Sequence, residues 1–272
     1  MNNAKTEMRN PLSMNMDKMS TEQMARLVIS ANYDAVRAVE NAASDITLAI
    51  DEIAKAFENG HRLFYIGAGT SGRIGIMDAA ECPPTFGVSY DMVQGIIAGG
   101  NDRVFRAGEN EEDHYEKGRI AIRENGLSDG DVLVGISAAG NAAFVVGAID
   151  EAKAVGCTTV AVSSNEGSEI LKRAHISIYT DTGAEVLTGS TRLKAGTAQK
   201  IVLNTLSTCA MVKTGKVYEN MMINLSPSNE KLRGRVIRIV SEILSCDEVE
   251  ATAKLEANDW NIRRAVAGKE VS

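Results

Sequence analysis

Five short apolar runs recur through the middle of this 272-residue chain, and helical patterns separate them. Each run is five or six residues long and is bounded by Gly, Asp or Ser. Strands that are apolar along their whole length are typical of parallel sheets covered on both faces. The pattern therefore predicts an α/β fold with a doubly wound, five-stranded parallel sheet. The predicted strands cover residues 62–66, 93–97, 131–136, 157–162 and 175–179.

Helical sequences flank the predicted sheet on both sides. The first dozen residues predict an extended arm, and Ser20-Thr21-Glu22-Gln23 has the spacing of a capping box that starts a helix. A longer helix is predicted from Tyr33 to Phe57, followed by the stop signal Asn59-Gly60. After Thr182 the pattern predicts helices and no further strand. These helices cover residues 190–214, 229–244, 247–255 and 259–267.

The length suits one large α/β domain with helical additions better than two independent domains. The predicted division has three parts. An N-terminal arm with helices covers residues 1–58, the α/β domain covers 59–215, and a C-terminal helical extension covers 216–272.

A glycine-rich turn, Gly67-Ala68-Gly69-Thr70-Ser71-Gly72, joins the first predicted strand to a helix. Such a turn lets backbone N–H groups approach a ligand closely, and the helix N-terminus favours a negative charge. The hydroxyls of Thr70 and Ser71 add side-chain donors suited to a small terminal phosphate. Ligands of such sheets bind at the carboxyl ends of the strands, where Ser137-Ala138-Ala139-Gly140 also lies. We expect a phosphate site at this edge.

The same turn satisfies the dinucleotide pattern G-x-G-x-x-G, through Gly67, Gly69 and Gly72. A dinucleotide site needs a carboxylate about 20 residues later, at the end of the next strand. The next predicted strand instead runs into Ala98-Gly99-Gly100. The phosphate interpretation is therefore preferred to the dinucleotide one, and a structural turn that binds nothing is the third interpretation.

The net charge of −7 and the absence of a basic run argue against nucleic acid as a partner. Four cysteines, Cys82, Cys157, Cys209 and Cys246, are scattered without metal-ligand spacing, so we expect reduced thiols and no metal site. No apolar run approaches the length of a membrane span, and no signal segment begins the chain. A cytoplasmic protein that does not bind membranes is expected.

Two acidic positions are candidates for acid–base chemistry. Glu81 lies near the end of the helix that follows the turn, and Pro83-Pro84 is expected to stop that helix. A cluster over residues 109–113 includes Glu112 and follows the Gly99-Gly100 loop. Two carboxylates that converge on one substrate can divide the acid and base roles. The alternative for each is a solvated surface carboxylate.

Several segments together resemble the N-acetylmuramic acid 6-phosphate etherases. The resemblance covers nearly the whole chain, up to Asn229-Glu230-Lys231-Leu232. The chain also resembles the related glucokinase regulatory proteins. Both families share the sugar isomerase fold, with flavodoxin-like strand order. The segments that carry the resemblance are Thr6 to Pro11, Gly67 to Gly72, Asp78 to Gly87, Ile97 to Gly100, and Glu185 to Lys200.

The resemblance implies a lyase without a cofactor that removes D-lactate from C3 of an amino sugar phosphate by elimination and then hydration. Glu81 matches the acid that protonates the departing lactate oxygen, and Glu112 matches the carboxylate taken as base for the C2 proton. The resemblance also implies a homodimer with sites near the interface. The matching substrate-binding positions are Gly69, Thr70, Ser71, Gly72, Ser137, Ser190 and Thr191. Helix capping explains one of Ser190 and Thr191 equally well.

One loop departs from the family pattern. The loop after the third strand usually reads Ala-Ser-Gly-Arg-Thr in the family, whereas this chain has Ala138-Ala139-Gly140-Asn141-Ala142. Each lost charge-assisted hydrogen bond costs about 1.5–3 kcal/mol of binding unless Ser137 or Asn141 compensates. A non-catalytic sugar-phosphate sensor and an isomerase of the same fold therefore stand as alternatives. Retention of both Glu81 and Glu112 favours the lyase.

Overall fold

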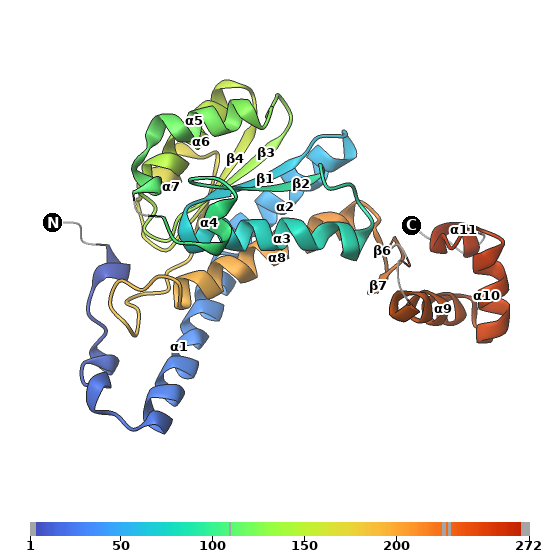
Figure 1. The fold of residues 1–272 in the computed structure, drawn as a ribbon, viewed down its shortest axis with the longest axis horizontal. Helices are drawn as coiled ribbons and strands as arrows, with labels where there is room; N and C mark the ends of the chain where they lie inside the picture. Colours follow the sequence, from blue (N-terminus) through green and yellow to red (C-terminus); the bar gives the residue numbers. More distant parts are fainter. Residues whose placement is uncertain (1–3, 109, 225–226, 228–229, 268–272) are drawn as a thin grey trace.

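A five-stranded parallel sheet forms the centre of the molecule in the computed structural model, which describes residues 4–108, 110–224, 227 and 230–267 (Figure 1). The strand order is β2-β1-β3-β4-β5, so the predicted doubly wound fold is confirmed. Each strand lies within one residue of its predicted bounds. The strands are β1 (Leu63–Gly67), β2 (Val93–Ile97), β3 (Val132–Ile136), β4 (Thr158–Ser163) and β5 (Ile176–Tyr179).

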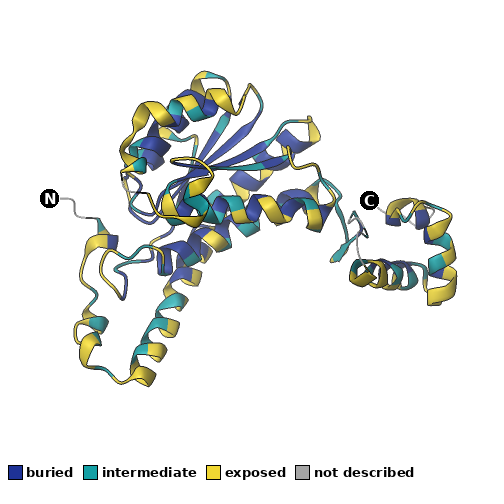
Figure 2. Ribbon diagram, in the orientation of Figure 1, coloured by how far each residue is buried: buried dark blue, intermediate teal, exposed yellow. Residues whose placement is uncertain are grey.

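Helices cover both faces of this sheet and make two separate cores (Figure 2). One face packs against α2 (Ala43–Glu58), α3 (Gly69–Phe86) and α8 (Lys194–Lys213). The other packs against α5 (Tyr115–Glu124), α6 (Ala143–Ala154) and α7 (Glu169–Arg173). All five residues of β1 and of β3 are buried, because apolar side chains on both faces of these strands are covered.

The order of the strands fixes where a ligand can bind. Strand β1 pairs with β2 on one side and with β3 on the other, and Gly67 lies opposite Ile136 at their carboxyl ends. The chain therefore reverses its direction of winding between these two strands, which leaves a crevice at their carboxyl ends. Helix α3 starts at this end of the sheet, beside α4 (Asp102–Phe105) (Figure 1).

The N-terminal segment contains three single-turn helices before α1 (Thr21–Asn41) begins at the predicted capping box. Ser20 Oγ accepts from the Gln23 N–H, and Gln23 Oε1 accepts from the Ser20 N–H. The predicted single helix from Tyr33 to Phe57 is wrong, because the chain breaks at Ala42 between α1 and α2. Helical periodicity continues across the break and conceals it. The three short helices are η1 (Lys5–Glu7), η2 (Pro11–Ser13) and η3 (Met16–Lys18).

The C-terminal segment forms a third, smaller core beyond the C-terminal end of α3. It contains α9 (Glu230–Leu244), α10 (Glu248–Glu256) and α11 (Ile262–Ala265). The prediction of helices alone after Thr182 is wrong, because a hairpin of β6 (Val217–Tyr218) and β7 (Met221–Met222) precedes α9. Strands of two residues are too short to give a periodic signal. Within the described residues, no helix is long and apolar enough to cross a bilayer.

Candidate active site

The glycine-rich turn is held by close contacts between its own backbone segments. A Cβ added to Gly72 would lie 2.7 Å from the carbonyl oxygen of Gly67 and 2.7 Å from Cγ1 of Ile97. Gly69 has a φ of +53°, in the left-handed region that favours glycine. The sequence therefore needs glycine at these positions for the chain to leave β1 and enter α3 directly.

Two long helices start at the crevice without a side-chain cap. Ala68 precedes α3 and Ala142 precedes α6, and neither side chain can accept from the first N–H groups of its helix. These N–H groups are available to an anionic ligand, which the positive end of each helix dipole also favours. The carboxyl ends of β1 and β3 are thus suited to binding a phosphate.

Thr70 and Ser71 lie against α8. The Ser71 hydroxyl donates to Oε1 of the buried Gln199 at 3.0 Å. Gly196 of α8 lies near both Thr70 and Thr191. A Cβ added to Gly196 would lie 3.6 Å from the methyl carbon of Thr70 and 3.5 Å from the carbonyl oxygen of Thr191. The fold therefore brings two predicted binding segments, the turn and the start of α8, side by side. Gln199 was not predicted, since its role depends on a contact across 128 residues.

Helix α8 starts at Lys194, so the predicted start at Ser190 is wrong and neither Ser190 nor Thr191 caps it. The carboxylate of Glu185 performs the capping instead. Its two oxygens accept from the N–H groups of Lys194 and Ala195, each at 3.0 Å. Since Glu185 is fully buried, the loop before α8 is fixed, and Ser190 and Thr191 lie half-buried within it.

Loop 137–143 follows β3 and lies beside a cavity of about 600 Å³. Ser137 is buried, and its Oγ accepts from the N–H of Gly140 at 3.0 Å. Oδ1 of Asn141 accepts from the N–H of Glu169 at the start of α7. Both polar side chains that this loop retains are therefore engaged within the protein, and Ala139 adds no polar group to the cavity wall.

The N-terminal arm packs against the same end of the sheet. Thr6 is fully buried, and its Oγ1 accepts from Nδ2 of Asn165 at 2.9 Å. Lys5 forms an ion pair with Asp181, which holds the pKa of Lys5 above its usual range. The sequence predicted an extended arm but gave no sign that it would contribute to the binding end of the molecule.

A second cavity, of about 180 Å³, lies directly beside the turn. Gly69 and Arg73 of α3 line one side, and Arg103 of α4 with Glu111 and Glu112 lines the other. The fold thus brings the exposed Glu112 next to the turn, although 43 positions separate Glu112 from Gly69. Of the acidic cluster, position 109 lies outside the described residues.

Cations surround the carboxylate that neighbours Glu112. Lys117 lies 3.4 Å and Arg103 lies 3.3 Å from the Glu111 oxygens, and these contacts hold the pKa of Glu111 below its usual value. Glu112, by contrast, is exposed in the short helix η4 (Glu111–Asp113). The two adjacent glutamates therefore differ in environment, with Glu111 held in ion pairs.

Glu81 lies on the exposed face of α3, away from the turn. Twelve residues separate it from Gly69 along the same helix, which at 1.5 Å per residue is roughly 18 Å. A single chain does not bring Glu81 to Glu112. The predicted stop at Pro83-Pro84 is also wrong, because α3 continues to Phe86 and ends at Gly87, whose φ is +61°. Helical φ values suit proline, so two prolines fit in the last turn.

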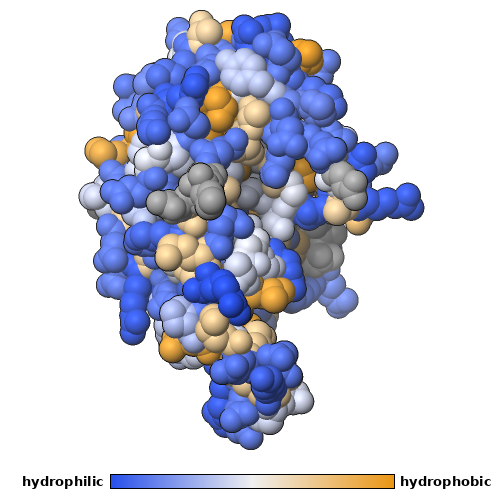
Figure 3. All heavy atoms as spheres, turned by 90° about the vertical axis from the view of Figure 1, so that its left-hand side faces the viewer, coloured by the Kyte–Doolittle hydropathy of each residue, from blue (hydrophilic) through white to orange (hydrophobic). Residues whose placement is uncertain are grey.

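The end of the molecule that carries the turn is mostly hydrophilic at its surface, with scattered hydrophobic residues (Figure 3). Such a surface suits a polar ligand. In the described part of the chain, no group of three or more His, Cys, Asp or Glu side chains is arranged to hold a metal ion.

Comparison with known proteins identifies the family. Residues 45–153 match the glucokinase regulatory protein N-terminal SIS domain, and residues 119–208 match the SIS domain. Solved structures share the fold at low identity. A phosphoheptose isomerase from Francisella tularensis aligns with a TM-score of 0.51 and 16% identity, covering 71% of this chain and 100% of that chain. The sugar isomerase domain of the RpiR transcription factor from Sphaerobacter thermophilus aligns with the same values, over 93% of its length.

Relatives at much higher identity cover almost the whole sequence. The N-acetylmuramic acid 6-phosphate etherase of Actinobacillus pleuropneumoniae serotype 7 is 47% identical over 96% of this chain and 86% of its own length. That of Oenococcus oeni is 46% identical over 96% of this chain and 88% of its own length. With this identity over nearly its full length, the chain belongs to the N-acetylmuramic acid 6-phosphate etherase family.

Proposed function

We propose that this chain is a carbon–oxygen lyase that cleaves the C3 lactyl ether of N-acetylmuramic acid 6-phosphate. The products are N-acetylglucosamine 6-phosphate and D-lactate, as in recycling of cell-wall amino sugars. Beyond the family itself, the main support is the cavity in which the phosphate turn, through Gly69, meets the carboxylate of Glu112. We place the reaction in the cytoplasm, in keeping with four free thiols.

The turn is assigned to the 6-phosphate. The N–H group of Gly69 and the hydroxyl of Thr70 would bind it, aided by the uncapped start of α3. Ser71 and Gly72 would shape the turn, because the Ser71 hydroxyl donates to Gln199 and the Gly72 N–H donates to the carbonyl oxygen of Ala68. Ser190 and Thr191 belong to the same site, because the Thr191 backbone lies close to Thr70. Ser137 would contribute from the neighbouring strand end through the hydroxyl proton that it still can donate.

The carboxylates carry the chemistry. In the open-chain sugar, the C1 aldehyde acidifies the proton on C2, and Glu112 removes it. The electron pair forms a C2–C3 double bond as the C3–O bond breaks, and Glu81 protonates the lactyl oxygen. Water then adds at C3 and a proton returns to C2, which gives N-acetylglucosamine 6-phosphate. Each proton transfer of this kind typically contributes about 10²–10⁴ in rate.

Since Glu81 is roughly 18 Å of helix from the turn, we infer that a second copy of the chain supplies it. A homodimer of this kind has a suitable surface on α1, where Ile29, Tyr33 and Val36 recur at helical spacing and are 67%, 65% and 51% exposed. Each site would then combine Glu112 of one subunit with Glu81 of the partner.

A sugar-phosphate sensor without catalysis is the second candidate function. The observation that favours it is loop 137–143, whose retained polar side chains, Ser137 and Asn141, already bond to Gly140 and Glu169.

We also propose the three-part division of the chain at 58/59 and 215/216, because the third hydrophobic core contains only residues beyond the second boundary.

The test is incubation of the purified protein with N-acetylmuramic acid 6-phosphate and measurement of D-lactate. We expect release by the wild type and a loss of at least about 100-fold in Glu81→Gln and in Glu112→Gln. Mixing the two variants after dissociation should restore part of the activity, because one site of each mixed dimer regains both glutamates. No lactate from the wild type, together with tight phosphosugar binding, would instead support the sensor.

A further inference from the structure

The small cavity beside the turn contains two guanidinium groups that the proposed reaction does not use. Arg73 enters it from α3 and Arg103 from α4, and Gly69 and Glu112 line the same space. A guanidinium group beside a phosphate turn can bind either the phosphate or a second anionic group such as a carboxylate. The cavity therefore bears on which substrate the site accepts.

Arg103 has unused hydrogen-bonding capacity. One terminal nitrogen lies 3.3 Å from Oε1 of Glu111, while Nε is buried and has no partner among the described residues. A buried N–H without a partner costs about 1–3 kcal/mol, more when it is charged. Glu111 is also shared with Lys117, so the charge of Arg103 is incompletely balanced. A bound anion would balance the remaining charge of Arg103.

Arg73 is held in place by its Nε, which donates to the carbonyl oxygen of Val104 at 2.8 Å. Within the described residues, its terminal nitrogens have no partner in the protein. The bond to Val104 also ties α3 to α4, the helix that carries Arg103. This bond therefore fixes the two helices that carry Arg73 and Arg103 relative to each other.

The size of the cavity limits the group that can enter. Its volume of about 180 Å³ gives room for a small group of several non-hydrogen atoms. A lactyl group with its ether oxygen has six non-hydrogen atoms and carries a carboxylate. A whole amino sugar phosphate is several times larger than this group.

We propose that Arg103 and Arg73 bind the carboxylate of the substrate's lactyl group, while the turn at Gly69 to Gly72 binds the phosphate. This assignment rests on the proposed function. The substrate is then recognised by two anionic ends, with the ether carbon held between them and beside Glu112. The arginines also offset the repulsion between the lactyl carboxylate and Glu112, two like charges in one small cavity.

The test compares two ligands that differ only by the lactyl group. Binding of N-acetylmuramic acid 6-phosphate and of N-acetylglucosamine 6-phosphate is measured by calorimetry in a Glu112→Gln parent, which prevents turnover. Adding Arg103→Ala should weaken binding of the first ligand about 10- to 100-fold. Binding of the second ligand should change by less than about twofold. Arg73→Gln should act in the same direction.

Arg106→Ala is the matched control, because Arg106 is exposed three residues beyond Arg103 and does not line the cavity. Arg103→Gln keeps most of the side-chain volume and replaces Arg103→Ala if that variant fails to fold. Equal weakening of both ligands, or no weakening of either, would overturn the assignment. If the parent binds neither ligand and the wild type releases no lactate, the proposed function itself has failed and this assignment with it.

Discussion

The hydroxyl of Ser71 in the phosphate turn donates a 3.0 Å hydrogen bond to Oε1 of Gln199, a fully buried residue in the first half of α8. The turn is therefore supported by helix α8, which starts at Lys194, 122 residues after Gly72. The amide Nε2 of Gln199 is buried without a partner among the described residues. The pair fixes the direction of the Ser71 hydroxyl.

Removing that support should weaken substrate binding more than chemistry. Gln199→Ala deletes the acceptor of the Ser71 hydroxyl, and a hydrogen bond of this kind contributes about 1 kcal/mol. We expect KM for the phosphosugar to rise about fivefold with kcat within twofold. Steady-state kinetics measure both, and Lys200→Ala, at the exposed neighbouring position, is the control. A fall in kcat at unchanged KM would contradict a supporting role.

A methyl group at Gly72 should distort the phosphate turn. The added Cβ would stand 2.7 Å from the carbonyl oxygen of Gly67, a backbone atom that cannot move aside freely. We expect Gly72→Ala to lower the free energy of unfolding by about 1–3 kcal/mol and to abolish measurable phosphosugar binding. Urea unfolding and calorimetry are the measurements. Gly234→Ala, in open space on α9, should leave both unchanged or raise stability slightly.

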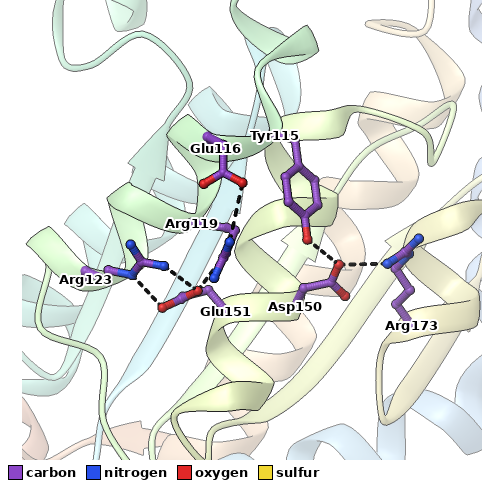
Figure 4. Close-up of polar contacts among 7 residues, drawn as sticks. All are labelled: Tyr115, Glu116, Arg119, Arg123, Asp150, Glu151 and Arg173. Carbon is purple, nitrogen blue, oxygen red and sulfur yellow. Dashed lines mark hydrogen bonds and ion pairs between the residues drawn. The ribbon is translucent and has the colours of Figure 1, made fainter.

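Tyr115 anchors the start of α5 close to Glu112 in the sequence, and Figure 4 shows the contacts of Tyr115. Its hydroxyl donates to Oδ2 of Asp150 at 2.8 Å, and Asp150 also accepts from Arg173 at 2.7 Å. Tyr115 begins α5 three residues after Glu112 and packs against Gly147 of α6. Tyr115→Phe should therefore lower kcat about three- to tenfold with little change in KM. Tyr90→Phe, at a 76% exposed position, is the control. A variant with wild-type kcat would show that the start of α5 does not depend on this bond.

Acid should release the neighbouring network in the same figure (Figure 4). Glu151 is buried between Arg123 and Arg119, which hold its pKa at about 2 instead of 4.5. A lowered folded-state pKa stabilises the protein above about pH 4.5, and this contribution is lost as the pH falls toward 2. Glu151→Gln should lower stability by about 1–3 kcal/mol at pH 7 and by much less at pH 3. Denaturant unfolding at both pH values tests this. An equal loss at both would mean that the carboxylate charge contributes little.

Local features of the sequence were sufficient for the scaffold. Continuous apolar runs predicted every strand of the main sheet to within one residue, and the capping box at Ser20 predicted the start of α1. The errors lie where local signals are weak. The break at Ala42 falls inside an uninterrupted helical period, and the start of α8 at Lys194 depends on a cap from Glu185 nine residues earlier.

The sequence by itself determined the sheet, the glycine-rich turn after β1 and the glycine positions that the turn requires, because apolar periodicity and backbone sterics act over a few residues. Only the tertiary structure decided which distant groups meet there. It placed Glu112 in the cavity with Gly69, put Gln199 behind Ser71, and left Glu81 far along α3. Such contacts depend on how helices pack against the two faces of the sheet, and a pattern within one segment carries no information about the packing of another.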